Sequence, residues 1–393
     1  MDDKEKIKNK LPVKIVVTGG GSGGHVSAAS TMISALKEKY TLTNQTFMYI
    51  GGDLGMMDEK PGNSIEKKVF SNETFNQAYI RAGKLQRKFS LKAVYLLFRV
   101  LLGFWDSYKI LRTFKPDVVI STGGFISVPV CLVAKLLKAK IYLHEQTAAA
   151  GLSNRIIGRC ADKIFLTFPS SKEYFPKGKT VHTGNLLRPE ILNKSGTGNI
   201  VDSVKNMLVN QEEFPIIYIS GGGLGSHILN ITVKDALLIL LQDFQIILQT
   251  GDNQTFKDYQ VLNKEKEKLS KNLAKRFLPV KYVREKEIGF LLNNIDLFVG
   301  RAGANSVYEM GVLKIPSIFI PIPWVTHNEQ EKNALILKEL GLAEIIPQGE
   351  LTPENLALKI KRFYEKPKNF DTQEIDKVFL KDAHKIILQN IGL

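Results

Sequence analysis

Residues 295–334 read IDLFVGRAGANSVYEMGVLKIPSIFIPIPWVTHNEQEKNA, and this stretch alternates apolar runs with glycine-bearing or polar loops. Two of the runs, Leu297–Val299 and Ile315–Ile320, have the length and composition of buried strands. Each is followed by a loop and then by a helical pattern. The order strand, loop, helix, strand, loop, helix predicts an α/β fold with a parallel sheet, in which ligand-binding loops leave the carboxyl ends of the strands.

The two loops of this stretch carry groups that can bind hydroxyls. The first, Gly300–Ala304, contains glycines that let the backbone approach a ligand closely, and Asn305 or Ser306 is predicted to cap the helix that follows. Glu309 lies near the start of that helix and Gln330 near the start of the next. A carboxylate can accept hydrogen bonds from the two hydroxyls of a ribose, and an amide suits a sugar hydroxyl. The alternative is that Glu309 only complements a helix dipole.

Length and composition indicate an ordinary globular protein. A chain of 393 residues predicts two domains, and 44% apolar with 24% charged residues is typical of a chain with a large core. Cys131 and Cys160 form neither a metal motif nor a disulfide framework, which favours a reducing cytosol. The charged start predicts no secretory signal, and no apolar run reaches the roughly 18–20 residues that span a bilayer.

The positive charge is concentrated in the first half of the chain. Residues 1–190 hold 29 Lys and Arg against 15 Asp and Glu, whereas the remainder holds 25 against 24. This asymmetry predicts an anionic partner for the first half, such as nucleic acid, acidic lipid or a phosphorylated substrate. The alternative is that the lysines only solvate helix faces.

Glycine loops follow strands in both halves. The strand Val13–Val17 leads into Thr18–His25, and Ile216–Ile219 leads into Ser220–Ser226. A third loop, Ser121–Ser127, follows another predicted strand. A glycine loop between a strand and a helix binds anions through bare amides and the positive helix end. The spacing differs from the dinucleotide motif, so NAD is not expected.

The glycine loop after a strand occurs in both halves of the chain, which predicts two similar domains. A polar linker, Asn193–Asn199, separates two α/β series. We therefore expect two Rossmann-like domains, residues 11–190 and 200–366, with parallel sheets facing a central cleft. The amphipathic tail, residues 371–393, is predicted to be a helix that packs back on the first domain.

Residues 81–115 combine basic and apolar side chains. The basic residues ahead of the apolar segment are Arg81, Lys84, Arg87, Lys88 and Lys92. The segment itself, Ala93–Trp105, is rich in leucine and aromatic residues. This combination is typical of proteins that lie on an anionic membrane surface. The alternative is a helix packed against the sheet; we expect a mixture, with Leu85–Phe89 available to lipid.

Taken in order, these motifs resemble the MurG family of bacterial peptidoglycan glycosyltransferases, which have the GT-B fold. The resemblance covers nearly the whole chain. It rests on the loop with His25, Gly123–Pro129, His144–Gln146, Gly184–Arg188, Gly221–Gly225 and residues 295–334. It implies an inverting transferase that moves N-acetylglucosamine (GlcNAc) from UDP-GlcNAc to the muramyl 4-hydroxyl of lipid I, an undecaprenyl-linked muramyl-pentapeptide. The products would be lipid II and UDP.

The resemblance also implies site residues. Those expected to bind UDP-GlcNAc are Ser22, Gly23, Thr147, Arg188, Gly223, Leu224, Gly225, Tyr282, Val283, Gly303, Ala304, Asn305, Glu309, Glu329 and Gln330. Those expected to bind the acceptor are Gly20, Gly21, Gly24, Gly123, Gly124, Phe125, His144 and Gln146. Glu309 would hold the ribose, Tyr282 would stack near the uracil, and the Val283 backbone would read the uracil edge.

Two residues are candidates for the catalytic base. His25 is the first, because an imidazole titrates near neutrality and this one lies beside an anion-binding loop. Its alternative role is to donate a hydrogen bond to the acceptor pyrophosphate. Glu145 is the second candidate, and its alternative role is to orient His144. His182, His227 and His384 are interpreted as structural or surface residues.

Several positions depart from the family pattern. Thr147 replaces the usual asparagine, and Glu329 replaces the first glutamine of a pair. Gly223 and Leu224 replace a serine and a glutamine of the second-domain glycine loop, which removes side-chain contacts to phosphate. Ala28 stands at the position of a proline.

The chain contains no Asp-x-Asp motif, so no metal or other cofactor is expected beyond the substrate UDP-GlcNAc. The resemblance implies a peripheral protein on the cytoplasmic face of the bacterial inner membrane, with cell-wall synthesis and division proteins as candidate partners. One alternative is another GT-B enzyme that acts on a UDP-sugar, with a different acceptor or with epimerase activity. A non-catalytic nucleotide- or nucleic-acid-binding protein is less expected, because stacking aromatics are not interleaved with the lysines.

Overall fold

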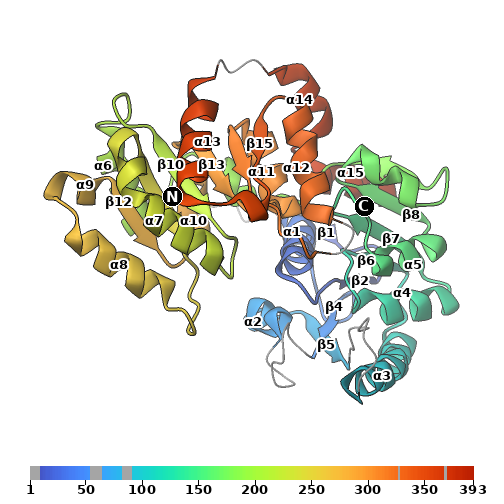
Figure 1. Ribbon diagram of the computed structural model, residues 1–393. Helices are drawn as coiled ribbons and strands as arrows, with labels where there is room; N and C mark the ends of the chain where they lie inside the picture. Colours follow the sequence, from blue (N-terminus) through green and yellow to red (C-terminus); the bar gives the residue numbers. More distant parts are fainter. Residues whose placement is uncertain (1–8, 54–63, 82–90, 326–327, 367–369) are drawn as a thin grey trace, which may run out of the picture. The chain divides into compact units, whose positions relative to one another are not determined.

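The computed structural model describes residues 9–53, 64–81, 91–325, 328–366 and 370–393. The chain forms two compact units (Figure 1). Unit 1 comprises the chain up to Arg188 together with Leu380–Leu393, and unit 2 comprises Pro189–Phe379.

Unit 1 is built on a parallel sheet with the strand order β5-β4-β2-β6-β7-β8-β9. The strands are β2 Ile15–Thr18, β4 Phe47–Gly52, β5 Asn76–Ile80, β6 Val118–Ser121, β7 Lys140–Glu145, β8 Lys163–Leu166 and β9 Thr180–His182. A separate short pair joins β1 Asn9–Lys10 to β3 Tyr40–Thr41. The central strands are fully buried and apolar, as expected for a parallel sheet covered on both faces.

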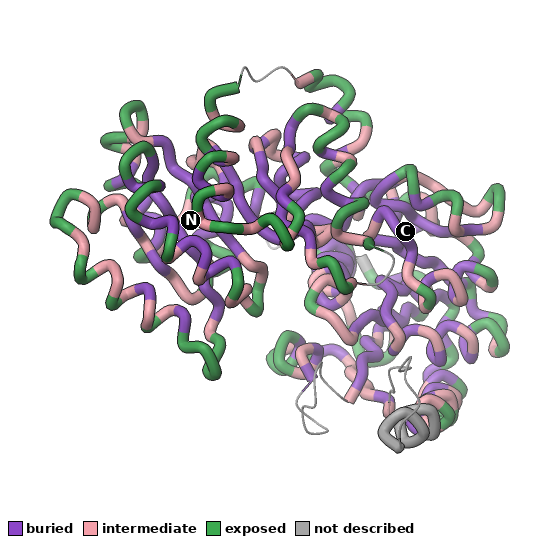
Figure 2. Tube along the Cα trace, viewed as in Figure 1, coloured by how far each residue is buried: buried purple, intermediate pink, exposed green. Residues whose placement is uncertain are grey.

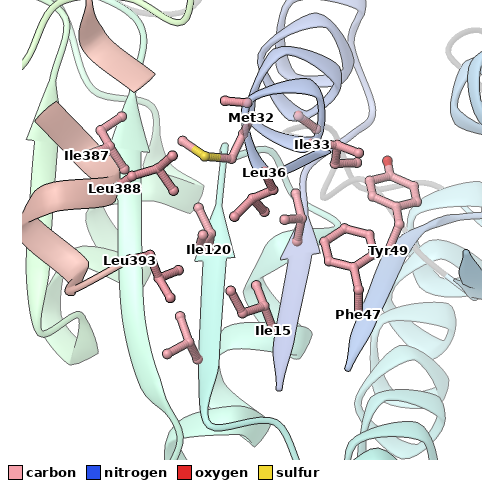
Figure 3. Close-up of a cluster of buried hydrophobic side chains, with 14 of the residues drawn as sticks. Ile15, Met32, Ile33, Leu36, Phe47, Tyr49, Ile120, Ile387, Leu388 and Leu393 are labelled. Carbon is pink, nitrogen blue, oxygen red and sulfur yellow. The ribbon is translucent and has the colours of Figure 1, made fainter. Parts of the chain in front are cut away.

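Helices cover both faces of this sheet. They are α1 Gly23–Lys39, α2 Ile65–Phe70, α3 Leu91–Phe114, α4 Ser127–Leu136, α5 Leu152–Cys160 and α15 Ala383–Ile391, with the 3-10 turn η1 Pro169–Tyr174. Because side chains alternate along a strand, Ile15 and Val17 face the core under α1, whereas Val16 faces the core under α4 and α5. Figure 3 shows Ile387 and Leu388 of α15 beside Met32 of α1 on the first of these cores.

Unit 2 repeats the plan with the strand order β12-β11-β10-β13-β14-β15, again parallel. The strands are β10 Ile216–Ser220, β11 Gln245–Gln249, β12 Phe277–Val280, β13 Leu297–Gly300, β14 Ser317–Phe319 and β15 Ala343–Ile345. The helices are α6 Asn199–Leu208, α7 His227–Asp243, α8 Asp258–Lys268, α9 Lys271–Lys275, α10 Glu285–Leu292, α11 Ala304–Leu313, α12 Glu329–Glu339, α13 Pro353–Glu365 and α14 Thr372–Val378, with 3-10 turns η2 Pro189–Leu192 and η4 Gln348–Glu350. In both units the central strands are buried and the outer faces of the helices are exposed (Figure 2).

Some boundaries differ from those predicted. Helix α1 begins at Gly23, inside the predicted loop Thr18–His25, because Ser22 acts as its N-cap and accepts a hydrogen bond from the His25 amide. Helix α11 is capped by Gly303 rather than by Asn305 or Ser306. The strands β5 and β9 and the helices α2 and α10 were not predicted.

The predicted single helix at residues 371–393 is two helices. The first, α14, ends in unit 2, where the buried ring of Phe379 lies 5.0 Å from that of Tyr308. The second, α15, belongs to unit 1. The first helix therefore ends at Val378, next to the buried Phe379, and the second begins at Ala383.

Helix α3 contains most of the predicted membrane segment. Among the described residues, no helix has both the length and the apolar character that crossing a membrane requires. Lys84, Arg87, Lys88 and the loop Leu85–Phe89 lie outside the described residues. Arg81 is described, and its guanidinium is paired with Asp106 at 2.6 Å.

Candidate functional site

The first glycine loop positions an imidazole. It connects β2 to α1, and Ser22 starts the helix so that His25 lies in its first turn. The Nδ1 atom of His25 lies 2.8 Å from the carbonyl oxygen of Thr122, the residue after β6. Because a carbonyl only accepts, Nδ1 carries the proton and the lone pair of the neutral ring is at Nε2. Burial lowers the pKa of His25, and the bond to Thr122 opposes this shift, so the neutral ring is favoured.

The loop after β6 lies directly against the first loop. The amide of Gly20 donates to the Gly123 carbonyl at 3.4 Å. Gly124 has φ +90°, and a side chain there would overlap the Gly20 carbonyl oxygen and lie 3.1 Å from Cδ2 of His25. The Phe125 ring fills the space beside Gly21. The absence of side chains at these glycines therefore lets the two loops and the imidazole meet.

Several residues predicted for the acceptor site meet around His25. The Nε2 atom of Gln146 donates to the Thr122 carbonyl at 2.9 Å, and its Oε1 atom would lie 3.4 Å from a side chain at Gly24. The predicted residues that gather on these loops are Gly20, Gly21, Ser22, Gly23, Gly24, His25, Gly123, Gly124, Phe125 and Gln146. Arg188 is the last residue of the first segment of unit 1 and is partly exposed.

Glu145 is buried, and both oxygens of its carboxylate accept hydrogen bonds from neighbouring residues. It lies at the end of β7 and accepts hydrogen bonds from the amide and hydroxyl of Thr147, both at 2.8 Å, and from Nδ2 of Asn154 at 2.8 Å. Burial raises the pKa of Glu145, and these bonds oppose the shift. The alternative that Glu145 orients His144 is wrong, because its carboxylate holds the following loop instead. The Thr147 hydroxyl is engaged in this loop.

His144 is enclosed in the sheet. It is fully buried in β7, and its Nε2 donates to the Gly184 carbonyl at 3.0 Å. Burial lowers the pKa of His144 to about 4, so the ring is neutral. Among the described residues, its Nδ1 has no hydrogen-bond partner. The position inside a strand makes His144 a support for the Gly184 turn.

Glu66 belongs to the same region and was missed by sequence reasoning. It lies on α2, is buried, and accepts a hydrogen bond from the Gly21 amide at 2.7 Å. A side chain at Gly20 would overlap its carboxylate. The only local signal is Ser64, which caps α2, and nothing in the sequence connects this short helix to a loop 45 residues earlier.

The second glycine loop, Gly221–Gly225, connects β10 to α7 and differs in construction. Gly222 has φ +88° and its amide donates to Ser220 Oγ at 3.1 Å, whereas a side chain at Gly223 would meet open space. Leu224 is 71% exposed. Gly225 lies so close to the Thr250 carbonyl that no side chain fits. No side chain covers the loop at Gly222 and Gly223, whereas the Gly222 amide is engaged with Ser220 and the Gly225 amide with the Gly222 carbonyl.

Arg301 is a buried cation beside this loop, and no role had been predicted for it. It directly follows β13, its Nη2 donates to Ser226 Oγ at 2.8 Å and its Nη1 to the Ile320 carbonyl at 3.0 Å. Among the described residues its buried Nε has no partner. Burial lowers the pKa of Arg301. A buried guanidinium held by neutral acceptors suits an anionic ligand.

Residues predicted to read the nucleotide base lie after β12. The amide of Val283 donates to Gln249 Oε1 at 3.1 Å, so that amide is already engaged. The hydroxyl of Tyr218 donates to the same oxygen at 2.9 Å. Tyr282 is half-exposed and available for stacking. Gln249 was missed because its role depends on the neighbouring strands of the sheet.

The remaining predicted donor residues lie on α11 and α12. Gly303, Ala304 and Asn305 form the start of α11, whose N-cap makes no side-chain hydrogen bond, and Glu309 is buried further along it. Glu329 and Gln330 begin α12, and Gln330 Oε1 accepts a hydrogen bond from the Ile322 amide at 3.1 Å. In the part of the chain that the structure describes, no three His, Cys, Asp or Glu side chains form a metal-binding group.

Comparison with known proteins identifies the family. Models of the glycosyltransferase family 28 N-terminal and C-terminal domains match residues 15–166 and 216–388. A Bacillus cereus relative, named UDP-N-acetylglucosamine--N-acetylmuramyl-(pentapeptide) pyrophosphoryl-undecaprenol N-acetylglucosamine transferase 2, is 33% identical over 380 residues, which cover 96% of this chain and 99% of the relative. The chain belongs to the MurG family. A transferase of the same name from Clostridium botulinum, without the final number, is 35% identical over 357 residues, 91% of each chain.

The crystal structure of Acinetobacter baumannii MurG has the same fold. Its TM-score is 0.70 with 20% identity, and the match covers 97% of this chain and 99% of that chain. The predicted family and the predicted fold class, two parallel-sheet α/β domains of the GT-B type, are confirmed. The chain is a glycosyltransferase, as MurG family membership implies.

Proposed function

We propose that the protein transfers GlcNAc from UDP-GlcNAc to the muramyl 4-hydroxyl of lipid I, producing lipid II and UDP for peptidoglycan synthesis. The observation that carries this proposal is the identity of 33% with a transferase of that name along 96% of the chain. The arrangement around His25 and the second glycine loop is consistent with the chemistry.

His25 acts as the general base in this mechanism. The Thr122 carbonyl holds the proton on Nδ1, which leaves Nε2 to accept the proton of the attacking hydroxyl. Burial lowers the pKa of His25, so the imidazole is in the accepting form at neutral pH. Direct attack by the hydroxyl on the anomeric carbon inverts that centre. Glu145 supports the Thr147 loop and takes no proton.

The acceptor and donor diphosphates lie on different glycine loops. The loops Gly20–Gly24 and Gly123–Gly124 receive the acceptor pyrophosphate, with Phe125 and Gln146 around it. The amides of Gly20, Gly21 and Gly123 already donate within the protein, so the contacts come from the remaining amides of these loops. In unit 2 the loop Gly223–Gly225 receives the donor diphosphate through the amides of Gly223 and Leu224, since the Gly225 amide donates to the Gly222 carbonyl at 3.0 Å. Arg301 and the amides at the start of α11 stabilise the charge that develops on departing UDP.

The rest of the donor is held by side chains of unit 2. Glu309 accepts hydrogen bonds from the ribose hydroxyls, and Tyr282 stacks near the uracil. Glu329 and Gln330 bind hydroxyls of the GlcNAc ring. The proposal also keeps Arg188, which belongs to unit 1, as a ligand of the leaving phosphate. No metal is needed because amides and guanidinium groups supply the positive charge; loss of activity with EDTA and recovery with Mg²⁺ would contradict this.

We further propose that unit 1 lies peripherally on the anionic cytoplasmic face of the inner membrane. On α3, Leu101 is 62% exposed and Trp105 is 53% exposed. The ammonium of Lys109 lies 5.1 Å from the Trp105 ring centroid and the Arg112 guanidinium 5.7 Å from that of Tyr108. Exposed aromatic and basic side chains on one helix suit a membrane interface.

The reaction is tested by measuring UDP release. Purified protein receives UDP-GlcNAc and a lipid I analogue, and each substrate is omitted in turn. We expect UDP only with both substrates, together with a product heavier by one GlcNAc residue. A UDP-sugar epimerase would convert UDP-GlcNAc without acceptor, which would contradict the proposal.

The membrane surface is tested with a matched pair of variants. Leu101 on α3 and Leu238 on α7 are similarly exposed, at 62% and 61%. Leu101→Ser should weaken binding to vesicles that contain anionic lipid, whereas Leu238→Ser should not. Equal effects of the two substitutions would exclude α3 as the membrane contact.

A further inference from the structure

A buried glutamine, Gln249, contacts two separate segments of unit 2 that are proposed to bind the donor. It is the last residue of β11 and pairs in parallel register with Ser220, the last residue of β10. Its Oε1 accepts a hydrogen bond from the Val283 amide at 3.1 Å, and its Nε2 donates to the Gly222 carbonyl at 3.1 Å. One side chain therefore bridges the segment after β12 and the second glycine loop.

The two ends of the Gln249 amide have fixed roles. A backbone amide only donates and a carbonyl only accepts, so the contacts to Val283 and Gly222 determine which end carries the oxygen. The hydroxyl of Tyr218 donates to the same oxygen at 2.9 Å. The glutamine is thus held in one orientation, and an apolar residue in its place would break both links at once.

The link to Gly222 acts on the turn that presents the proposed diphosphate-binding amides. The Gly222 carbonyl also accepts from the Gly225 amide at 3.0 Å, which closes a turn around Gly223 and Leu224. Gly222 has φ +88°, and a side chain at Gly222 or Gly223 would meet nothing within 4 Å. Anchoring the Gly222 carbonyl to β11 restricts this open turn before a ligand binds, which lowers the entropic cost of binding.

We infer that Gln249 is a positioning residue for the donor, which holds the diphosphate loop through Gly222 and the uracil-reading segment through Val283. The inference rests on the proposed function and adds to it a link between two parts of the donor site. Gln249 acts through these two backbone groups rather than by contact with the nucleotide. Its loss should therefore weaken donor binding and leave the proposed proton transfer in unit 1 unaffected.

The test compares the binding of UDP and uridine by isothermal titration calorimetry. Uridine has no phosphate, so its binding depends on the Val283 link but not on the Gly222 link, whereas UDP binding depends on both. Gln249→Leu should weaken uridine binding about 2- to 10-fold, the usual worth of one neutral hydrogen bond, and UDP binding about 5- to 100-fold. Gln249→Met keeps the unbranched shape of the side chain and should give the same result. In the UDP-release assay both variants should raise the KM for UDP-GlcNAc and leave kcat nearly unchanged.

Gln245 provides a matched control on the same strand. It is buried at the start of β11, and its Nε2 donates to the carbonyls of Met207 and Phe214 at 2.9 and 2.7 Å. Gln245→Leu removes two hydrogen bonds at the opposite end of β11 from the glycine loop. It should lower the free energy of unfolding without changing the affinity for UDP or uridine. Circular dichroism at the titration temperature shows whether each variant is folded.

Each outcome separates the inference from the proposed function. If the wild type binds UDP and the folded Gln249 variants bind both ligands equally well, the inference is wrong and the proposed function stands. If UDP and uridine binding weaken by the same factor, the Gly222 link has no effect of its own, and the inference is wrong. If Gln245→Leu gives the same pattern, the cause is a weakened strand, and the inference is again wrong. If the wild type binds no UDP, the proposed function itself fails.

Discussion

The two glycine loops of this protein follow the same plan of strand, turn and helix, but only one of them is enclosed by side chains. In the first, Thr122 packs on Gly19, Glu66 on Gly20 and Phe125 on Gly21. In the second, Gly222 and Gly223 face open space. The first loop is thus held in shape before any ligand binds, whereas the second relies on its own turn.

The difference corresponds to the different chemistry proposed for each loop. A proton-transfer residue must be held within a fraction of an ångström, and the enclosed loop holds His25 through Thr122. A diphosphate is bound by many amides at once, so an open loop beside Arg301 is sufficient. The comparison predicts that substitutions near the first loop affect rate and folding, while those in the second affect affinity.

The largest effect is expected for His25→Ala. Loss of the proposed general base should lower kcat about 10²- to 10⁴-fold, with little change in the KM for UDP-GlcNAc, because the proposed donor site is in unit 2. His182→Ala is the control and should retain wild-type kcat. The measurement is steady-state UDP release with a lipid I analogue.

The same assay separates the alternative role of His25. If His25 instead binds the acceptor pyrophosphate, its loss raises the acceptor KM and leaves kcat nearly intact. A pH profile gives a second criterion. Since burial lowers the pKa of His25, the midpoint of the acidic fall in kcat/KM should lie below the 6.5 of an ordinary histidine.

The next effect concerns pH-dependent stability. Burial lowers the pKa of His144 to about 4, from 6.5 for an ordinary histidine. Between these values the unfolded chain binds a proton that the folded chain does not, so the free energy of unfolding falls as pH decreases from 6.5 towards 4. His144→Gln should remove this contribution, which is on the order of 3 kcal/mol.

Urea denaturation at several pH values measures this difference. Glu145 shifts stability in the opposite sense, because burial raises its pKa, but it is present in both proteins and cancels in the comparison. Equal loss of stability in the wild type and His144→Gln on acidification would show that the buried imidazole does not control it.

The sequence predicted the sheets of both units but not the residues that contact their loops. Apolar runs of strand length and the glycine loops after them predicted both sheets, because those signals are local. The partners of the loops were not predicted: Glu66 and Gly21 are 45 residues apart, and the bond between them depends on where α2 packs. Likewise Gln249 and Arg301 act through neighbouring strands, which no single stretch of sequence reveals.

The burial of His144 and Glu145 could not be predicted from the sequence either. His144 was predicted to bind the acceptor and Glu145 was a candidate base, and both roles require a side chain that faces a ligand. In the structure β7 continues through Glu145, so both side chains are buried by the sheet and its loops. Strand boundaries depend on pairing with β8, and one or two residues decide between a catalytic and a supporting role.

A smaller effect is expected from a pair of glycine substitutions in the first loop. Gly21 has φ +77° and faces the Phe125 ring, so Gly21→Ala should destabilise the fold by about 1–2 kcal/mol or more. Gly23 is the first residue of α1, and a side chain there meets nothing within 4 Å. Gly23→Ala should therefore be neutral or slightly stabilising in the same denaturation experiment. Equal tolerance of both would mean that the loop is not enclosed.

The smallest effect is expected in the open loop and is a gain. A side chain at Gly223 meets nothing within 4 Å, so Gly223→Ser should fold normally and place a hydroxyl beside the proposed diphosphate site. One neutral hydrogen bond is worth about 0.5–1.5 kcal/mol, which corresponds to UDP binding about 2- to 10-fold tighter. Gly223→Ala is the matched control, since it adds the same carbon without the hydroxyl. Tighter UDP binding by serine but not alanine would show that this loop binds phosphate and has room for one more donor. Weaker UDP binding by both variants would show that the loop tolerates no side chain at Gly223. The second loop would then differ less from the enclosed first loop than the structure suggests.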